Sequence, residues 1–265
     1  MDLGLKGKRA LVTGASRGLG FAVARLLAQE GCAVAINSRN YKALEDAADQ
    51  IRQASNNKVT VVPFSGDLTD PSMPQSVVTK AADALKGLDI LVTNTAGPPA
   101  GAFEKIDEGQ WTDAIDMVFL AHVRLVRAAL PFLRQSPSPS VLAITSYAVK
   151  QPIDKLVLSN SIRAATASLM KSLALELGEE SIRFNAILPG WTKTERVTEL
   201  LEKRAEANGT DINTEIKKQT REIALKRMAE PEEFAKAAVF LVSPAAAYIT
   251  GAMLNVDGGA YKGTW

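Results

Sequence analysis

The chain has 265 residues, of which 46% are hydrophobic and 23% are charged, values typical of a globular protein and incompatible with a disordered or fibrous one. The 31 basic and 29 acidic residues are mixed along the chain, and the net charge of +2 comes without the basic stripe that nucleic-acid binding requires. The single cysteine, Cys32, excludes an internal disulfide, the first residues lack the apolar region of a signal peptide, and no apolar run approaches the roughly 20 residues of a transmembrane helix. We therefore expect a soluble cytoplasmic protein without a nucleic-acid partner, a membrane partner or a metal site.

Short β-rich runs alternate with longer helical patterns along the chain. The runs are Arg9–Thr13, Ala33–Asn37, Val59–Phe64, Ile90–Thr93, Ser140–Thr145, Ile182–Leu188 and Met253–Val256. The helical patterns are Leu19–Glu30, Lys42–Ala54, Gln75–Lys86, Glu108–Leu133, Leu156–Gly178 and Pro231–Val242. Almost continuously apolar runs are typical of strands buried on both faces of a parallel sheet. The pattern predicts an α/β protein, a single Rossmann-fold domain over residues 1–265 with a doubly wound parallel sheet, helices on both faces and ligands at the carboxyl ends of the strands.

The segment from Thr194 to Met228 interrupts this alternation. It is long, highly charged and helical in pattern, with apolar positions at Val197, Leu200, Leu201, Ile212, Ile216 and Ile223. We expect residues 194–228 to form a helical insertion that covers the substrate site as a lid. The alternative is a solvated helical excursion, because charge-rich helices are common on protein surfaces.

A glycine-rich turn, Thr13–Gly20, follows the first run and leads into the first helical pattern. Glycines at such a turn let the backbone approach a pyrophosphate closely, and the helix N-terminus supplies free N–H groups and the positive end of its dipole. This context favours a dinucleotide site over a purely structural turn. Its predicted cofactor-binding residues are Gly14, Ser16, Arg17, Gly18, Leu19 and Gly20.

The end of the second run indicates which dinucleotide binds. NAD-specific sites usually place an acidic residue there to bind the ribose 2′-hydroxyl, whereas this chain has Ser38 and Arg39. Together with Arg17, these side chains offer two guanidinium groups and a hydroxyl to a 2′-phosphate. We therefore predict NADP(H) as the cofactor. The alternative is that Arg39 merely begins the next helix.

Further motifs follow in order along nearly the whole chain. They are Gly66-Asp67-Leu68, Asn94-Thr95-Ala96-Gly97, Pro189-Gly190 with Thr194, Pro231-Glu232-Glu233, and Val256-Asp257-Gly258-Gly259. Together with Thr13–Gly20 they resemble the motifs of the short-chain dehydrogenases/reductases, most nearly those of the 3-oxoacyl-carrier-protein reductases. The resemblance implies that the first of these motifs contacts the adenine, that the second steadies the sheet beside the cofactor, and that the third reaches the nicotinamide. The residues assigned to the cofactor in this way are Asp67, Leu68, Asn94, Ala96, Gly97, Arg163, Pro189, Gly190, Thr192 and Thr194.

The same resemblance implies an Asn, a Ser, a Tyr and a Lys in the catalytic site. Ser146 stands at the serine position, but the tyrosine and lysine positions fall on Ser159 and Arg163, and the asparagine position falls on Val118. A serine hydroxyl donates a hydrogen bond but is a poor general acid. A guanidinium keeps the positive charge and can hold ribose hydroxyls, yet it cannot release a proton to a relay. We take Ser146, Ser159 and Arg163 as the catalytic candidates.

Two residues could compensate for the missing acid. Tyr147 adjoins Ser146 and either presents its hydroxyl to the site or packs against the neighbouring structure. His122 is the only histidine and titrates in the useful range, but it also fits as an ordinary helix residue. Lysines 150 and 155 fit best as surface residues, and Cys32 and Trp111 as core residues.

These residues leave three functions open. The first is an NADPH-dependent oxidoreductase that transfers hydride to a carbonyl substrate, such as a 3-oxoacyl thioester or a similar ketone, with an atypical proton donor. The second is a catalytically silent NADP-binding sensor or assembly subunit. The third is an elimination or isomerisation on the same scaffold. In each case the resemblance implies a homodimer or homotetramer, formed through the helices Glu108–Leu133 and Leu156–Gly178.

Overall fold

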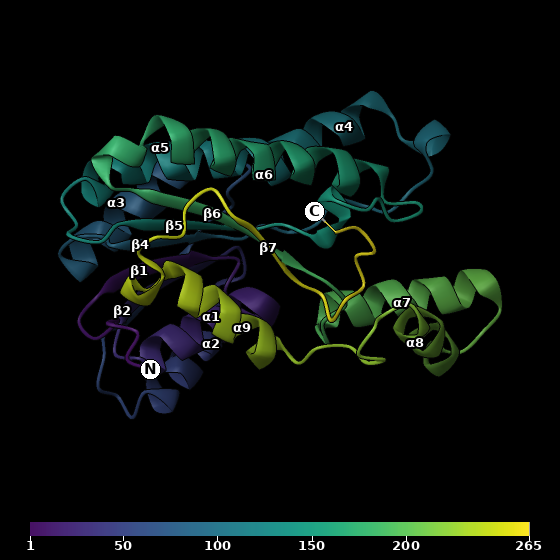
Figure 1. Ribbon diagram of the computed structural model, residues 1–265, viewed down its shortest axis with the longest axis horizontal. Coiled ribbons are helices and arrows are strands. Elements are labelled where there is room, and N and C mark those ends of the chain that lie inside the picture. The colour runs from purple at the N-terminus through teal and green to yellow at the C-terminus, as the bar shows by residue number, and fades with distance from the viewer. Residues whose placement is uncertain (265) are drawn as a thin grey trace.

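The computed structural model describes residues 1–264, and at its centre is a parallel β-sheet of seven strands in the order β3-β2-β1-β4-β5-β6-β7 (Figure 1). The strands are β1 (Arg9–Thr13), β2 (Ala33–Ser38), β3 (Val61–Ser65), β4 (Ile90–Thr93), β5 (Ser140–Ile144), β6 (Arg183–Pro189) and β7 (Met253–Val256). The order reverses direction between β1 and β4. In a sheet of this kind, that reversal opens a crevice at the carboxyl ends of the strands.

Helices cover both faces of the sheet, as the sequence predicts. The helices α1 (Gly18–Gln29), α2 (Tyr41–Ala54) and α9 (Pro231–Val242) lie on one face, and α3 (Met73–Leu85), α5 (Ala121–Leu133) and α6 (Val157–Glu176) lie on the other (Figure 1). Each face has its own cluster of buried apolar side chains, one centred on Val12 and Ile36 and the other on Leu11 and Leu91. Neighbouring residues of β1 and their partners thus point to opposite faces, which explains why these runs are apolar throughout.

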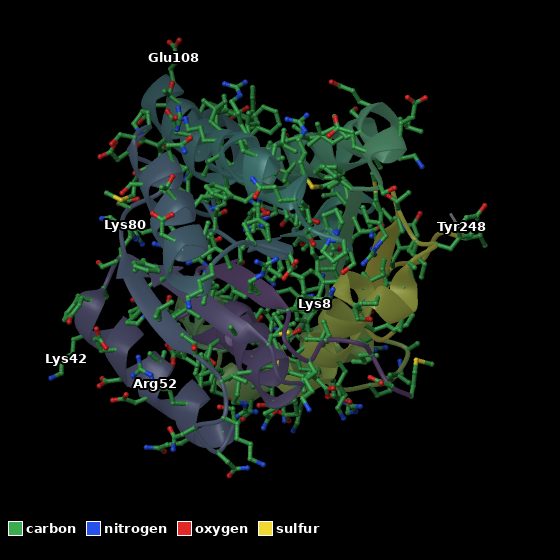
Figure 2. All side chains as sticks on the ribbon, turned by 90° about the vertical axis from the view of Figure 1, so that its left-hand side faces the viewer. Lys8, Lys42, Arg52, Lys80, Glu108 and Tyr248 are labelled. Carbon is green, nitrogen blue, oxygen red and sulfur yellow. The ribbon has the colours of Figure 1, made fainter. Side chains whose placement is uncertain are left out.

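Most charged side chains lie on the outside of this layered core, and Asp89, Arg163, Arg183 and Glu215 are the buried exceptions among the described residues. Lys42 on α2, Lys80 on α3 and Glu108 at the start of α4 (Glu108–Ile115) all project outward (Figure 2). No helix within residues 1–264 is both long and apolar enough to cross a membrane.

The predicted helix Glu108–Leu133 is divided in the structure. A π-helical turn, Asp116–Leu120, separates α4 from α5, and the N–H of Ala121 bonds to the carbonyl of Asp116 across it. Within this turn the carbonyl of Val118 accepts a hydrogen bond of 2.7 Å from the hydroxyl of Thr166 on α6. The hydroxyl therefore competes with the regular helical bond, and an apolar pattern carries no signal for such a contact.

The segment 194–228 contains two helices, α7 (Glu195–Asn208) and α8 (Ile212–Arg221), which lie beyond the edge of the sheet (Figure 1). Thr194 caps α7 by accepting from the N–H of Val197, and Asp211 caps α8 in the same way. A short bridge between Thr192 and Ala229 joins the two ends of the segment. Three of its buried apolar side chains, Leu201, Ile223 and Met228, belong to the same core cluster as Leu11 and Leu91. The segment is therefore packed onto the body of the protein through its apolar side.

Candidate active site at the carboxyl edge of the sheet

The glycine-rich turn after β1 is locked to the end of β4 by Asn94. The Asn94 side-chain amide donates to the carbonyl of Gly14 at 3.0 Å, and the Thr13 hydroxyl bonds to the backbone of Asn94 at both its N–H and its carbonyl. Gly14 has a φ of +57°, and a Cβ built on it would lie 2.8 Å from that amide nitrogen. No other residue type fits here without displacing Asn94.

The N-terminus of α1 is open to an anion. Its cap residue, Arg17, makes no side-chain capping bond, and its first turn contains no acidic residue. A Cβ on Gly20 would lie 2.4 Å from the carbonyl of Gly14, so the helix can approach the turn this closely only with glycine there. Free N–H groups at the positive end of a helix dipole match a pyrophosphate, and the residues present therefore fit a dinucleotide cofactor.

The two arginines predicted for the 2′-phosphate lie at the surface, with side chains more than 60% exposed. Arg17 forms ion pairs with Glu195 at 2.5 Å and Glu199 at 3.7 Å, both on α7. Arg39 lies 3.9 Å from the carboxylate of Asp67. Arg39 does not begin the next helix, because Asn40 caps α2 and the helix starts at Tyr41. Ser38, which ends β2, bonds weakly to the carbonyl of Asn40 at 3.4 Å.

The remaining cofactor candidates lie in the loops that follow β3, β4 and β6. Asp67 accepts bonds from the N–H and hydroxyl of Thr69, and Leu68 is buried in the core. After β6, the N–H of Gly190 bonds to the carbonyl of Val256 on β7. The others are a half-buried Ser16, Leu19 and Gly97, an exposed Ala96, and a buried Pro189 and Thr192.

Ser146, Ser159 and Arg163 lie along the end of β5 and the start of α6. Ser146 follows β5, and its hydroxyl oxygen accepts from the N–H of Ala148 at 3.1 Å. Ser159 is half-buried in the first turn of α6, and its hydroxyl bonds to no side chain or backbone group of the described chain. Arg163, one turn further, donates through Nη1 to the carbonyls of Ile144 and Thr145 at 3.5 and 3.3 Å.

Arg163 is a buried cation without an acidic partner. Its residue is 9% exposed, and no carboxylate of residues 1–264 forms an ion pair with it. Burial, assisted by the positive charge of Arg196, lowers the pKa of Arg163 to about 10. The guanidinium is therefore still charged at neutral pH. It lies across the carboxyl end of β5, beside the crevice of the sheet.

Sequence reasoning missed Arg196, the second residue of α7. Its guanidinium donates through Nη2 to the carbonyl of Pro98 at 3.2 Å. This bond joins α7 to the loop that follows β4. Nothing in the sequence distinguishes Arg196 from the many other charged residues of segment 194–228, because its significance depends on the loop that it reaches.

Tyr147 points into the core. Its phenolic oxygen accepts a hydrogen bond of 3.0 Å from the indole of Trp191, and burial raises its pKa further above neutrality. The residue is 7% exposed and belongs to the same apolar cluster as Leu201. The packing alternative therefore describes its position, and its phenol is not tuned as an acid for neutral pH.

His122 is fully buried on α5. Its Nδ1 lies 2.7 Å from the hydroxyl of Thr93, at the end of β4, and its Nε2 has no hydrogen-bond partner within the described chain. Burial, together with the charge of Arg163, lowers the pKa of His122 to about 3. The imidazole is thus neutral under ordinary conditions and lacks the second ring proton that an imidazolium gives as an acid.

The other residues singled out in the sequence are hydrogen-bonded to the backbone, exposed at the surface or packed in the interior. Lys150 donates to the carbonyl of Met253 at 3.3 Å, and Lys155 is exposed. Cys32 is buried, which raises its pKa to about 12. Trp111 is half-buried against a small cluster that contains Val118.

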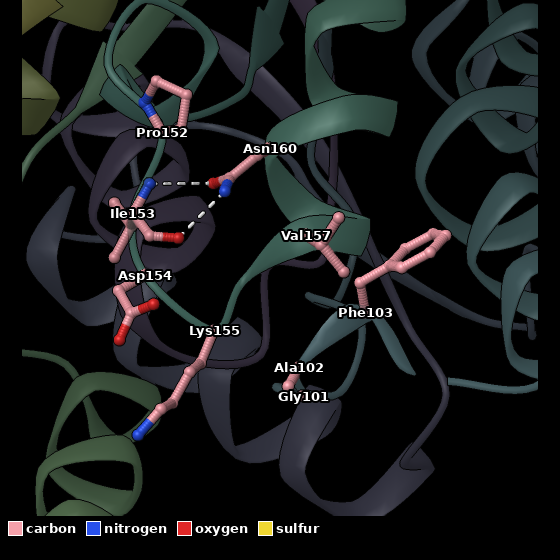
Figure 3. A pocket seen from close by; sticks show the side chains of 9 residues that line it. All are labelled: Gly101, Ala102, Phe103, Pro152, Ile153, Asp154, Lys155, Val157 and Asn160. Atoms are coloured by element: carbon pink, nitrogen blue, oxygen red, sulfur yellow. Dashed lines mark hydrogen bonds between the residues drawn. The ribbon is translucent and has the colours of Figure 1, made fainter. Parts of the chain in front are cut away.

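An open hollow of about 520 Å³ adjoins the N-terminal end of α6 (Figure 3). The side chain of Asn160 holds one wall in place by bonding to both the N–H and the carbonyl of Ile153. The opposite wall is the loop after β4, which is tied to the first wall by a bond from the N–H of Gly101 to the carbonyl of Lys155. Its lining residues are Gly101, Ala102, Phe103, Pro152, Ile153, Asp154, Lys155, Val157 and Asn160.

Comparison with known proteins identifies the family. Residues 14–261 match a family model described as enoyl-(acyl carrier protein) reductase. The chain is 33% identical to the L-rhamnose 1-dehydrogenase (NAD(P)(+)) of Sphingomonas sp. (strain SKA58) over 265 residues, which is 97% of each protein. The chain belongs to the short-chain dehydrogenase/reductase family.

Solved structures and further relatives agree with this assignment. The L-sorbose reductase of Gluconobacter frateurii, solved with NADPH and L-sorbose, superimposes with a TM-score of 0.94 at 30% identity, covering 99% of this chain and 100% of that one. The NADPH-dependent reductase BacG of Bacillus subtilis is 27% identical, over 96% of this chain and 98% of its own length. Proteins of this family are oxidoreductases that typically use NAD(H) or NADP(H), and several relatives use NADPH.

Proposed function

We propose that this protein is an NADPH-dependent reductase of a carbonyl substrate that works without the usual tyrosine and lysine. The observation that carries the proposal is the buried guanidinium of Arg163, which stays charged at the carboxyl end of β5 with no carboxylate of residues 1–264 paired with it. A fixed, largely buried positive charge stabilises the negative charge that develops on a carbonyl oxygen during reduction. The cofactor, when bound, supplies the hydride.

The serines complete this arrangement. The hydroxyls of Ser146 and Ser159 are free to donate hydrogen bonds to the carbonyl oxygen, which orients it, and water supplies the proton. Arg163 also stands where the family lysine holds the ribose, and its remaining N–H groups suit that role. Specificity for NADPH comes from Ser38, Arg39 and Arg17 around the 2′-phosphate.

Segment 194–228 acts as the lid of this site. Thr194, at the start of α7, has its methyl carbon 3.6 Å from the position that a Cβ of Gly18 would occupy, so the segment begins directly above the glycine-rich turn. A 3-oxoacyl thioester or similar ketone enters beneath it. The protein forms a homodimer or homotetramer, and a 75% exposed Leu175 on α6 supports a contact through that helix.

A silent NADP-binding sensor or assembly subunit is the second candidate, and it is favoured by Ser159 and Arg163 at the positions of the usual proton donor and its partner. NADPH and NADH titrations, followed by a carbonyl panel that includes 3-oxoacyl thioesters, separate the two. We expect preferential binding of NADPH and its oxidation with at least one panel member. Tight NADPH binding without turnover, together with a change of oligomeric state measured by light scattering, would instead establish the sensor.

A comparison variant sharpens this experiment. The double substitution Ser159→Tyr and Arg163→Lys restores the side chains that the family usually has. If the native protein is a reductase, it oxidises NADPH with at least one member of the panel, whether or not the double variant reduces the same compound. If the double variant alone is active on the panel, the native protein is not a conventional carbonyl reductase.

A further inference from the structure

The second arginine of the site, Arg196, lies beside Arg163 without an acidic partner. A Cβ built on Gly97 would lie 3.6 Å from Nη2 of Arg163 and 3.8 Å from Nε of Arg196, so both guanidinium groups face the same point above the loop after β4. Neither forms an ion pair within residues 1–264. Two like charges brought this close repel each other unless an anion joins them.

The place of Arg196 on α7 disfavours its positive charge. Arg196 occupies the first turn of α7, where the positive end of the helix dipole disfavours a cation. The two acids on the same helix that form ion pairs nearby, Glu195 and Glu199, are bonded to Arg17 instead. Arg196 is exposed, so water screens part of the repulsion between the two guanidinium groups, but no acid of the described chain forms an ion pair with either of them.

Both arginines retain donors for a ligand. Arg163 uses Nη1 for backbone carbonyls, while its Nη2 faces Gly97 and has no hydrogen-bond partner among the described residues. Arg196 uses Nη2 for the carbonyl of Pro98. Paired guanidinium groups with free N–H donors suit the oxygens of a carboxylate or a phosphate.

We propose that Arg163 and Arg196 form a binding site for an anionic group of the substrate, so that the carbonyl compound reduced here carries a carboxylate or a phosphate close to its carbonyl. This inference rests on the proposed reductase function and narrows its substrate class from 3-oxoacyl thioesters and similar ketones to ketones that carry an anionic group near the carbonyl. Because Arg196 belongs to the lid segment and Arg163 to the sheet edge, an anion between them also draws the lid onto the site.

Binding rather than turnover tests the proposal. The probes are two matched pairs, acetoacetate with methyl acetoacetate and dihydroxyacetone phosphate with dihydroxyacetone, titrated calorimetrically into the protein saturated with NADP⁺. A charge-assisted contact of about 1.5–3 kcal/mol corresponds to a preference of about tenfold or more for the charged member of a pair. The pair that shows the preference identifies the anion as carboxylate or phosphate. Equal binding within both pairs would overturn the proposal.

Substituted variants show which residue produces the preference for the charged ligand. Arg196→Gln should reduce the charged-to-neutral affinity ratio to about one to twofold. Arg196→Lys should retain part of the ratio, because a lysine keeps the positive charge but lacks the two parallel N–H donors of a guanidinium. Lys203→Gln removes an exposed cation of the same helix and should leave the ratio unchanged. An equal loss with Lys203→Gln would indicate a diffuse field instead of a site.

The cofactor is the competing occupant. If Arg196→Gln weakens NADP⁺ binding about tenfold and leaves the affinity ratio unchanged, Arg196 serves the cofactor and the proposal fails. Since no step of this experiment needs hydride transfer, an absence of turnover refutes the reductase function alone. A neutral ketone that is reduced as readily as its charged analogue refutes the anion site alone.

Discussion

His122 illustrates how a single buried side chain sets a dependence on pH. Its pKa is lowered to about 3 in the folded protein, because burial and the charge of Arg163 disfavour the imidazolium. In the unfolded chain the same group titrates near its ordinary value. The stabilisation from keeping it neutral is therefore fully present above the ordinary pKa of 6.5 and is lost as the pH falls from there toward 3.

We expect the free energy of unfolding to fall by about 1.4 kcal/mol per pH unit within this range, or by about 2 kcal/mol between pH 7 and pH 5. Urea unfolding at the two pH values measures it. His122→Asn, which keeps a polar group near the Thr93 hydroxyl but cannot be protonated, is the control and should lose the dependence between pH 7 and pH 5. A wild-type midpoint that does not move between these values would show that the imidazole is accessible to protons in the folded state.

The residues around the crevice differ in how far a sequence can foretell them. The positions of Gly14, Gly20 and Asn94 at one turn can be predicted, because they depend on backbone geometry that recurs with a fixed motif, whereas their contact with a cofactor stays a prediction. The position of Tyr147 was left open, since its contact with Trp191 joins residues that are 44 positions apart. Arg196 was missed because its charge has meaning only beside Gly97 and Arg163.

At the scale of elements, α7 is held over the glycine-rich turn by exposed charges. Arg17, which is expected to bind the 2′-phosphate, forms ion pairs with Glu195 and Glu199 of this helix. The carboxylates compete with the phosphate for this arginine, and their negative charge also repels the phosphate. Exposed ion pairs contribute only about 0–1 kcal/mol to stability, so the competition affects binding more than folding.

We therefore expect the double variant Glu195→Gln with Glu199→Gln to bind NADPH about threefold to tenfold more tightly at low salt, with an unfolding free energy within about 1 kcal/mol of the wild type. NADH, which has no 2′-phosphate, should gain less. Fluorescence titration measures both affinities. Glu202→Gln, an exposed acid on the same helix without an ion pair in the described chain, is the control. An unchanged NADPH affinity in the double variant would mean that Arg17 does not contact the phosphate.

Helices and strands were predicted to within about two residues at most boundaries because their apolar periodicity is strong. The division of Glu108–Leu133 could not be foreseen. It depends on the hydroxyl of Thr166, which comes from α6 and takes the carbonyl of Val118. A tertiary contact thus changed the local helix type without disturbing the hydrophobic pattern around it.

At the scale of the whole molecule, cofactor binding should raise the free energy of unfolding. A ligand that binds only the folded protein raises the unfolding free energy by about 2.7 kcal/mol when its concentration is 100 times its dissociation constant. The proposed cofactor site joins the ends of β1, β2, β4 and β6, so it exists only in the folded sheet. We expect a rise of this size with NADPH in urea unfolding followed by circular dichroism.

At the same concentration, NADH should give a smaller rise, because it lacks the charge that Arg17 and Arg39 are placed to bind. The variant Gly20→Ala is a matched control, since its methyl group would collide with the carbonyl of Gly14 and deform the turn. Equal stabilisation by the two nucleotides would contradict the NADP preference. Stabilisation of Gly20→Ala equal to that of the wild type would place the nucleotide elsewhere.

The bridge between Thr192 and Ala229 gives segment 194–228 a further property. The bridge and the bond from the N–H of Lys193 to the carbonyl of Ala229 bring the two ends of the segment together between β6 and α9. Loop-closure entropy grows slowly with length, so a segment of different length costs the sheet little. We therefore expect that α7 and α8 can be replaced by a helical pair of another length without disturbing β6 and α9, provided that the replacement keeps Thr194 at the glycine-rich turn and the apolar contacts of Leu201 and Ile223 with the core.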